Sequence, residues 1–127
     1  MSRDAVVAAL RAAERVTLIC HENPDADTLG SALGLRFAME RLGKAAEVVA
    51  ADGVPPFLTG LPGTGDVRRF PELEPDIAVI LDGPPSRTGS IARDSADWLA
   101  RARVVNVDHH VSNDGSEAAV SWIDPDA

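Results

Sequence analysis

The sequence predicts an α/β fold, a mostly parallel sheet with helices on both faces. Three stretches, residues 16–20, 76–82 and 103–110, contain runs of apolar, β-branched residues, which is typical of strands buried on both faces. Stretches with the apolar spacing of amphipathic helices stand between them. Strands that alternate with helices in this way favour parallel pairing, so we expect one sheet with a helical layer on each side.

The first part of the chain predicts a helix, a strand and a second helix. Ser2 is a candidate cap for a helix that ends near Glu14, and the strand at 16–20 follows. The second helix is expected over residues 28–42, with Gly43 as the residue that ends it. The apolar faces of the two helices are expected to consist of Val6, Val7 and Leu10 in the first and Leu29, Leu33, Phe37, Met39 and Leu42 in the second.

The rest of the chain continues the alternation. A strand is expected at 46–51, a loop rich in Pro and Gly at 52–65, and a strand at 76–82. A helix at 95–102 then leads into the strand at 103–110. The apolar side chains expected to pack inward from the loop and the last helix are Phe57, Leu58, Leu61, Trp98 and Leu99.

Charge and cysteine content narrow the function classes. The 127 residues include 12 basic and 20 acidic ones, for a net charge of −8, which argues against long nucleic acids and anionic membranes as partners. The single cysteine, Cys20, is expected to be a buried apolar residue, and a chain without disulfides suits a reducing cytoplasm. The N-terminal stretch is charged and amphipathic, unlike a signal peptide, and no apolar run approaches the roughly 20 residues that span a bilayer.

Metal-binding residue types follow three of the four predicted strands. His21 comes directly after the first strand, and Asp82 ends the third. Asp108, His109 and His110 end the fourth. Because the carboxyl ends of parallel strands open on the same edge of a sheet, we expect these side chains to converge there.

A set of five residues forms a candidate site for two divalent ions. Its three carboxylates and two imidazoles suit Mn²⁺, with Mg²⁺ or Co²⁺ as alternatives. Five candidate ligands are more than the four that hold a single structural zinc ion. Two such ions would lower the pKa of a bound water and neutralise phosphoryl oxygens. The five residues are His21, Asp25, Asp27, Asp82 and His109.

These residues also have simpler interpretations. Asp25, Asp27 and Thr28 are of the types that cap helices, and Asp82 is a common turn residue. A cap needs only one acceptor, however, and it does not explain His21 or the two histidines after the fourth strand. A nucleotide-binding domain without metals is disfavoured, because no glycine-rich phosphate loop joins a strand to a helix.

Three stretches of the chain resemble the motifs of the DHH phosphoesterase family. HENPDADTLGS at 21–31 is similar to the first motif, ILDGPPSRTG at 80–89 to the second and VDHH at 107–110 to the third. Within the family, the chain is most similar to bacterial bifunctional oligoribonuclease and pAp phosphatase-like proteins. The resemblance implies an Mn²⁺-dependent phosphoesterase that acts on short oligoribonucleotides or on nucleotides such as adenosine 3′,5′-bisphosphate.

The resemblance also implies a role for each metal-binding residue. His21 and Asp25 would hold one Mn²⁺, and Asp27 and His109 would hold the other. Asp82 would bridge the two ions.

Further residues receive roles from the same resemblance. His110, a candidate catalytic residue together with Asp82, would face the substrate phosphate, and Asp108 would orient its neighbours. Arg87 and Asn23 are candidate substrate contacts. Both also have structural alternatives, a solvated side chain for Arg87 and closure of its own turn for Asn23.

The chain departs from the family pattern at its end. Family members carry a further metal-binding aspartate on a later strand and then a separate substrate-binding domain, whereas this sequence ends at SWIDPDA. We therefore expect residues 1–127 to be the N-terminal part of a DHH domain, without its C-terminal part and without the substrate-binding domain. Asp114, Asp124 and Asp126 follow His110 too closely to replace the later aspartate.

Two classes of function follow from these expectations. The first is hydrolysis of phosphate esters at a dinuclear metal site, with cyclic dinucleotides, polyphosphate or pyrophosphate as alternative substrates. The second is an inactive or noncatalytic fragment that binds a metal or a nucleotide and needs the missing half, a second copy in a homodimer or another partner chain.

Overall fold

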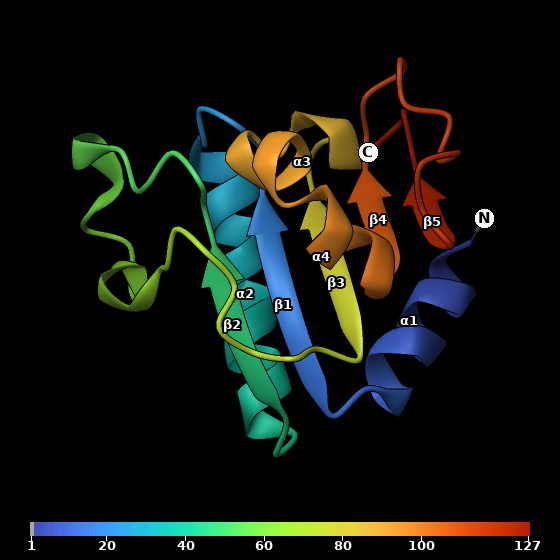
Figure 1. Ribbon diagram of the computed structural model, residues 1–127, viewed down its shortest axis with the longest axis horizontal. Helices are drawn as coiled ribbons and strands as arrows, with labels where there is room; N and C mark the ends of the chain where they lie inside the picture. Colours follow the sequence, from blue (N-terminus) through green and yellow to red (C-terminus); the bar gives the residue numbers. More distant parts are fainter. Residues whose placement is uncertain (1) are drawn as a thin grey trace.

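Among residues 2–127, which the computed structural model describes, five strands form one sheet, and every neighbouring pair is parallel. The strand order is β2-β1-β3-β4-β5 (Figure 1). The bounds are Arg15–Cys20 for β1, Ala45–Val49 for β2, Ile77–Leu81 for β3, Arg103–Asp108 for β4 and Val120–Ile123 for β5. The predicted parallel α/β fold is confirmed.

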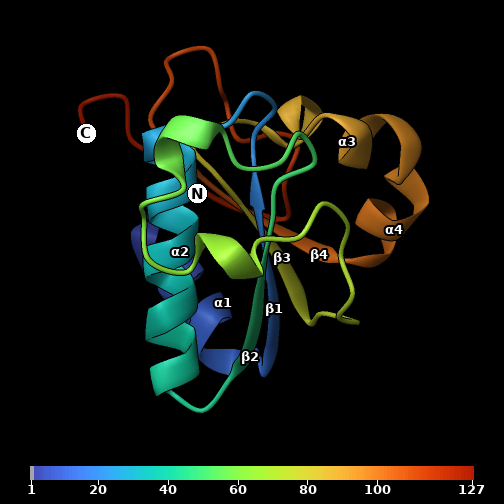
Figure 2. The ribbon, with the colours of Figure 1, turned by 90° about the vertical axis from the view of Figure 1, so that its left-hand side faces the viewer.

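Helices cover both faces of the sheet (Figure 2). One face carries α1 (Arg3–Ala12) and α2 (Ala26–Arg41), and the other carries α3 (Ser90–Asp94) and α4 (Ala96–Arg101). Short 3₁₀ helices lie in the connections, at Pro56–Leu58, Thr64–Asp66 and Pro85–Arg87. In the part of the chain that the structure describes, no helix is both long enough and apolar enough to span a membrane.

The neighbours β1 and β3 mark the point where the chain changes its direction of travel across the sheet. From β1 the chain goes to β2 at one edge, and from β3 it goes to β4 and β5 toward the other edge. In open parallel sheets, ligands bind at the carboxyl ends of the strands beside such a point. The loops after β1 and β3 therefore frame the place where a ligand is expected.

Alternating side chains of β1 build a core on each face of the sheet. Val16 and Leu18 belong to the larger apolar cluster under α1 and α2, whereas Ile19 belongs to the cluster under α3 and α4. Cys20 also lies in the larger cluster and is fully buried, as predicted. Burial raises the pKa of its thiol to about 12, which makes Cys20 unreactive at neutral pH.

Both ends of α2 have the residue types that end helices. Asp25 is the N-cap, so the helix begins at Ala26, earlier than the predicted Thr28. Beyond the other end, Gly43 has a φ of 81° and its N–H donates to the Glu40 carbonyl at 3.0 Å. Glycine adopts this left-handed conformation without a steric penalty, and it ends the helix as predicted.

Several predicted details need correction. The expected core residues Val7, Phe37, Leu42 and Phe57 are 36%, 43%, 63% and 80% exposed. Helical spacing does not define the width of the buried stripe, and the first three lie at its margins. In the loop after β2, a 3₁₀ turn buries Leu58, as predicted, and leaves Phe57 exposed.

Other packing predictions are confirmed, and some boundaries differ. Leu61 packs against the larger core cluster, and Trp98 and Leu99 pack against the smaller one. The first helix ends at Ala12, before the predicted Glu14. Two short elements, α3 with 5 residues and β5 with 4, were not predicted, because neither is long enough to show a period.

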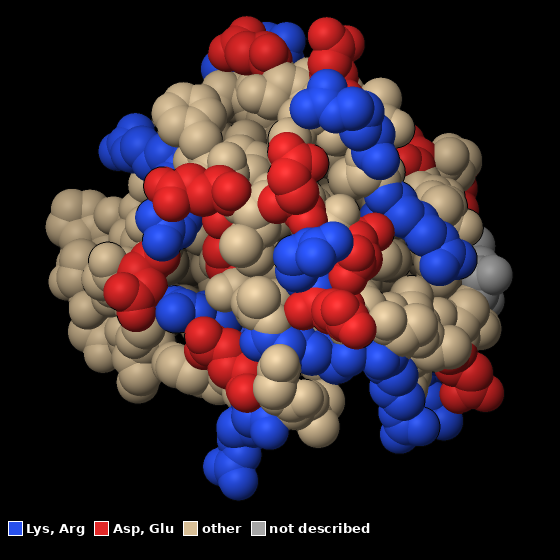
Figure 3. Space-filling model, turned by 60° about the horizontal axis from the view of Figure 1, so that its bottom comes forward, with Lys and Arg blue, Asp and Glu red and all other residues tan. Residues whose placement is uncertain are grey.

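The edge of the sheet where the strands begin carries both signs of charge side by side (Figure 3). Arg15 Nη2 lies 3.1 Å from Asp76 Oδ1, and Asp76 Oδ2 accepts hydrogen bonds from the backbone N–H groups of Glu14 and Arg15. Lys44 Nζ donates to the Arg11 carbonyl at 2.8 Å. Arg15 and Lys44 on this edge are therefore engaged by neighbouring groups.

We expect Leu29→Ala to lower the free energy of unfolding by about 2–5 kcal/mol, because a fully buried side chain is lost beneath α2. Leu42→Ala, which changes a 63% exposed leucine at the end of the same helix, should change it by less than about 1 kcal/mol. Urea unfolding followed by circular dichroism measures both. Equal losses in the two variants would contradict the packing described here.

Candidate metal centre

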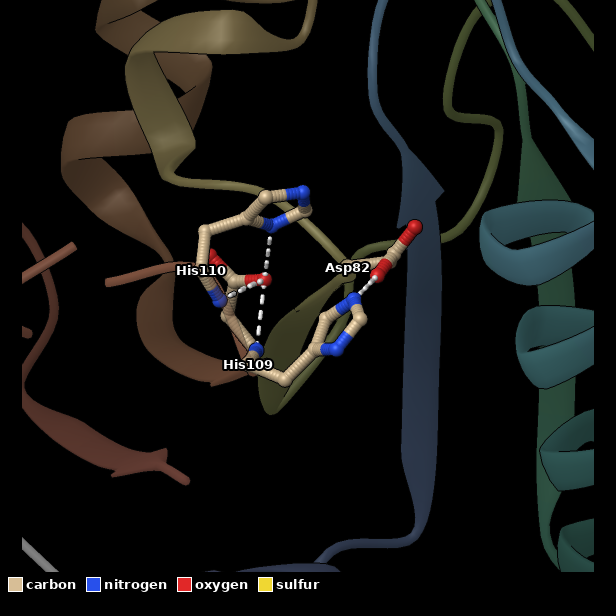
Figure 4. Close-up of side chains that lie close together, drawn as sticks. Asp82, His109 and His110 are labelled. Atoms are coloured by element: carbon tan, nitrogen blue, oxygen red, sulfur yellow. Dashed lines mark hydrogen bonds and ion pairs between the residues drawn. The ribbon is translucent and has the colours of Figure 1, made fainter. Parts of the chain in front are cut away.

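The Asp82 carboxylate lies between two histidines. Its Oδ1 is 2.8 Å from His109 Nε2 (Figure 4), and its Oδ2 is 3.6 Å from His21 Nε2. Asp25 Oδ1 lies 3.4 Å from the same His21 nitrogen. Two imidazole nitrogens and two carboxylates from distant parts of the sequence therefore converge on one point.

The register of the sheet explains this convergence. Cys20 of β1 pairs with Leu81 of β3, and Leu81 pairs with Val107 of β4. The next residue along each strand is His21, Asp82 or Asp108. Each of these residues thus emerges at the same level of the sheet, at the carboxyl ends of three adjacent strands.

The backbone of Asp82 makes a sharp turn at the end of β3. Its φ is 66°, in the left-handed region that Asp and Asn tolerate better than most residues. The Asp82 N–H donates to the Val107 carbonyl at 2.9 Å, which holds the turn against β4. The side chain is directed between the histidines and is 11% exposed.

Asp82 is a carboxylate in a place that disfavours negative charge. Burial raises the pKa of the Asp82 carboxyl above its usual range, and the nearby charge of Asp25 raises it further. Interactions with the histidine rings act in the opposite direction. A bound cation would favour the ionised form of Asp82, so the electrostatics of this site fit a metal ion.

The Nε2 atom of His21 faces the carboxylates, and a metal ion needs this nitrogen without a proton. Its Nδ1 lies 2.6 Å from the Glu22 carbonyl, which only accepts hydrogen bonds, so the proton belongs on Nδ1. The other nitrogen, Nε2, then has a free lone pair in the neutral ring and faces Asp25 and Asp82. The His21 backbone N–H donates to the Thr28 hydroxyl at 3.3 Å, which fixes the start of this loop.

Asp25 combines the two roles that the sequence left open. Its Oδ1 accepts a hydrogen bond from the Thr28 N–H at 3.0 Å, so it caps α2, and the same oxygen faces His21. Burial raises the pKa of the Asp25 carboxyl, but the hydrogen bond from the Thr28 N–H and the interaction with the His21 ring more than offset this and place the pKa below its usual value. The carboxylate is therefore ionised at neutral pH, as a metal ligand must be.

Asp108 and His110 form a second pair, and the His110 ring lies close to His109 and Asp82 (Figure 4). Asp108 Oδ1 lies 2.6 Å from His110 Nδ1 and accepts the backbone N–H of His109 at 2.7 Å. The hydrogen bond to Asp108 raises the pKa of His110, which favours the charged imidazolium. Burial raises the pKa of Asp108, but its hydrogen bonds, that from Asn113 first, lower it below its usual value.

The potential ligands fall into two groups that share Asp82. Within each group, one ligand atom per residue lies within 4.8 Å of every other. The groups are His21, Asp25 and Asp82, and Asp82, Asp108, His109 and His110. Nitrogen and oxygen donors of this kind fit a divalent metal such as Mn²⁺ or Zn²⁺.

Asp27 does not join either group among residues 2–127. It lies exposed in the first turn of α2, next to the residues that do. Its predicted role as a ligand of the second ion stays a prediction.

Arg87 and Asn23, the predicted substrate contacts, line the cavity that opens onto the site. This cavity of about 380 Å³ is also lined by His21, Glu22, Asp25, Asp82, Gly83, Pro84, His110 and Ser112. Arg87 Nη1 lies 3.1 Å from Glu22 Oε1, and the Glu22 N–H donates to the Arg87 carbonyl at 2.6 Å. Asn23 has a φ of 49°, and its N–H donates to Asp52 Oδ2 at 2.8 Å. Arg87 therefore has a structural ion pair, and the backbone of Asn23 is held by a residue outside its own turn. The roles of both as substrate contacts stay predictions.

Sequence reasoning missed three residues of this region. Glu22 pairs with Arg87, and the buried amides of Asn106 and Asn113 contact each other behind Asp108. Asn106 gave one signal that could have revealed it, since it is the single polar residue in the middle of an otherwise apolar strand. Asn113 lies in a polar loop and has no comparable signal.

The fold and the site agree with a known family. The family model for the DHH family, N-terminal domain, matches residues 15–127. The chain belongs to the DHH family. The match leaves out the first 14 residues, which include α1.

Two individual proteins are similar to this chain. The bifunctional oligoribonuclease and PAP phosphatase NrnA of Thermus thermophilus is 33% identical over 101 residues, which cover 77% of this chain and 28% of that protein. The crystal structure of an exopolyphosphatase-related protein from Bacteroides fragilis matches with a TM-score of 0.82 at 25% identity, over 96% of this chain and 38% of that one. The chain thus spans less than half the length of either relative.

We expect Asp82→Asn to weaken the binding of Mn²⁺ by about 100-fold or more, because the carboxylate shared by both ligand groups becomes a neutral amide. Asparagine tolerates the left-handed backbone of this position, so the fold should persist. Isothermal titration calorimetry with MnCl₂ measures the affinity.

The matched control is Asp114→Asn, which removes the same charge from an exposed carboxylate whose contact is the Ser116 N–H. This variant should bind Mn²⁺ as the wild type does. Wild-type affinity in Asp82→Asn would show that Asp82 is not a ligand.

Proposed function

We propose that this chain is the metal-binding domain of an Mn²⁺-dependent phosphoesterase that hydrolyses short oligoribonucleotides or nucleotides such as adenosine 3′,5′-bisphosphate. The single observation that carries the proposal is the Asp82 carboxylate with a histidine nitrogen at each of its oxygens. It lies at the carboxyl ends of β1, β3 and β4, where open parallel sheets bind ligands. The name of the Thermus relative, an oligoribonuclease and PAP phosphatase, supports this substrate class.

The ligand groups suggest how two ions would be held. His21 and Asp25 would hold one ion and His109 the other, with Asp82 shared, and Asp27 completes the second set in this proposal. When bound, two such ions supply Lewis-acid stabilisation of phosphoryl oxygens and a water that is acidic enough to act as a nucleophile near neutral pH.

The residues beside the ligand groups would bind and orient the phosphate. His110 directs its Nδ1 toward Asp108, so its Nε2 faces away from that contact, and in the protonated ring that the raised pKa favours this nitrogen would donate to a phosphate oxygen in the cavity. Arg87 lies in the wall of the same cavity and can exchange its ion pair with Glu22 for a pair with a phosphate. Asn23 adds a side-chain amide at the rim.

The charge of the chain favours small substrates over long nucleic acids. With a net charge of −8, its attraction for a phosphate depends on the metal ions and on the few cationic groups of the cavity. A polymer would extend beyond that region over an acidic surface. The buried, unreactive Cys20 is in keeping with a cytoplasmic location.

The proposal predicts release of mononucleotide from a linear diribonucleotide and of inorganic phosphate from adenosine 3′,5′-bisphosphate, both dependent on Mn²⁺. His21→Ala should lower both rates by about 100-fold or more, because a metal ligand is removed. Polyphosphate belongs in the same panel, because the name of the Bacteroides relative includes exopolyphosphatase. Chromatography and phosphate detection measure the products.

Absence of Mn²⁺-dependent release from every substrate would contradict the proposal for this chain. If Mn²⁺ still bound, the result would favour the alternative, a noncatalytic metal-binding module.

We expect Arg87→Ala to raise KM for adenosine 3′,5′-bisphosphate by about 10-fold with a smaller change in kcat, since one charge-assisted hydrogen bond to a bound phosphate is lost. The matched control is Arg93→Ala in α3, whose side chain is 69% exposed, as is that of Arg87. Arg93 pairs with Asp94 and does not line the cavity. Steady-state kinetics test this role, and equal KM values in the two variants would rule it out.

A further inference from the structure

Three buried polar side chains lie behind the histidines at the end of β4. Asn106 is fully buried, and Asn113 and Asp108 are 7% and 6% exposed. Buried polar groups are destabilising unless they are hydrogen-bonded, so a cluster of three needs a complete set of partners. Each of the three has such partners.

The partners of each side chain in the cluster fix which of its atoms donate hydrogen bonds and which accept them. Asn106 Nδ2 donates to the carbonyls of Ile80 at 3.0 Å and Gly83 at 2.8 Å. Carbonyls only accept, so Asn106 must direct its NH₂ group to them and its Oδ1 toward Asn113. Asn113 Nδ2 then donates to Asn106 Oδ1 at 2.8 Å and to Asp108 Oδ2 at 2.8 Å.

The remaining bonds complete the arrangement at each end. Asn113 Oδ1 accepts the Gly115 N–H at 2.9 Å, which fixes the amide within its loop. Asp108 uses its second oxygen, Oδ1, for the backbone N–H of His109 and for His110 Nδ1. These hydrogen bonds connect the turn after β3 with His110. We call the three side chains that form them, Asn106, Asn113 and Asp108, the amide relay.

The relay joins the parts of the site that come from two strands. Ile80 and Gly83 lie on either side of Asp82 in the sequence, so Asn106 holds the turn that presents Asp82. Asp108 holds the backbone of His109 and the ring of His110. Asn113 is the link between these two ends.

From these contacts we propose that Asn113, acting through Asp108 and Asn106, is a positioning residue of the centre. It holds the His110 ring in one orientation and keeps His109 in place against Asp82. This inference rests on the proposed function for its catalytic meaning, but the orientation of His110 can be measured without metal or substrate.

The test is the ring nitrogen spectrum of His110 in the metal-free chain at one fixed pH. In the wild type, ¹⁵N NMR should show Nδ1 protonated and hydrogen-bonded to Asp108. In Asn113→Ala, Asp108 loses the amide donor that holds its Oδ2, and the His110 spectrum should shift toward a mixture of ring states. The affinity for Mn²⁺ should fall by about 10-fold to 100-fold, as is typical when a partner of a metal ligand is removed.

Thr17→Val is the matched control for loss of a buried polar contact. Thr17 is fully buried and donates to Glu47 at 2.7 Å, on the part of the sheet formed by β1 and β2. This variant should lose stability while its His110 spectrum and Mn²⁺ affinity stay those of the wild type. If Asn113→Ala does not fold, Asn113→Ser carries the test, because a hydroxyl donates one hydrogen bond where the amide donates two.

An unchanged His110 spectrum in the folded Asn113 variant would overturn the inference and reduce the relay to a structural role. A wild-type chain that binds no Mn²⁺ would instead overturn the metal centre of the proposed function. In that case the His110 spectrum alone decides the inference.

Discussion

The parallel pairing of β3 with a strand on each side is the constraint on which the site depends. Leu81 faces Cys20 of β1 and Val107 of β4, so the residue after each of them emerges at the same height. If either of these strand pairs slipped by one residue, an apolar side chain would point into the site at the strand ends. A metal ligand would then point toward a layer of helices. The apolar side chains that pack these strands between α1 and α2 on one face and α3 and α4 on the other therefore also set the positions of the ligands.

Packing brings negative charges together at a place where they repel each other. Burial and the negative charge of Asp25 both disfavour the ionised form of Asp82, and the histidines offset part of this energetic cost. The fold carries this arrangement because the strands beneath it are almost entirely buried and tightly paired. A cation would remove the repulsion at its origin, so we expect occupancy and folding stability to be coupled.

The sequence predicted what depends on local pattern and on strand topology. Continuous apolar runs gave the buried strands, and the polar residues that end them gave His21, Asp82 and His109 as neighbours before any contact was known. Spacing could not show which helix positions lie at the margin of the core, so the exposure of Leu42 was missed. The pairing of Asn106 with Asn113 was missed because it depends on the path of a loop after β4, which composition does not encode.

The left-handed backbone of Asp82 has a consequence for how this family can change over evolution. At a φ of 66° the residues accepted with little strain are Gly, Asn and Asp, and only the last carries a charge. A relative that loses the chemistry by drift would therefore be expected to carry Asn or Gly at this position and to retain the fold. Conversely, glutamate, although it also has a carboxylate, is disfavoured by the backbone alone. Two requirements therefore select aspartate at position 82: a negative charge, and a residue type that tolerates a positive φ.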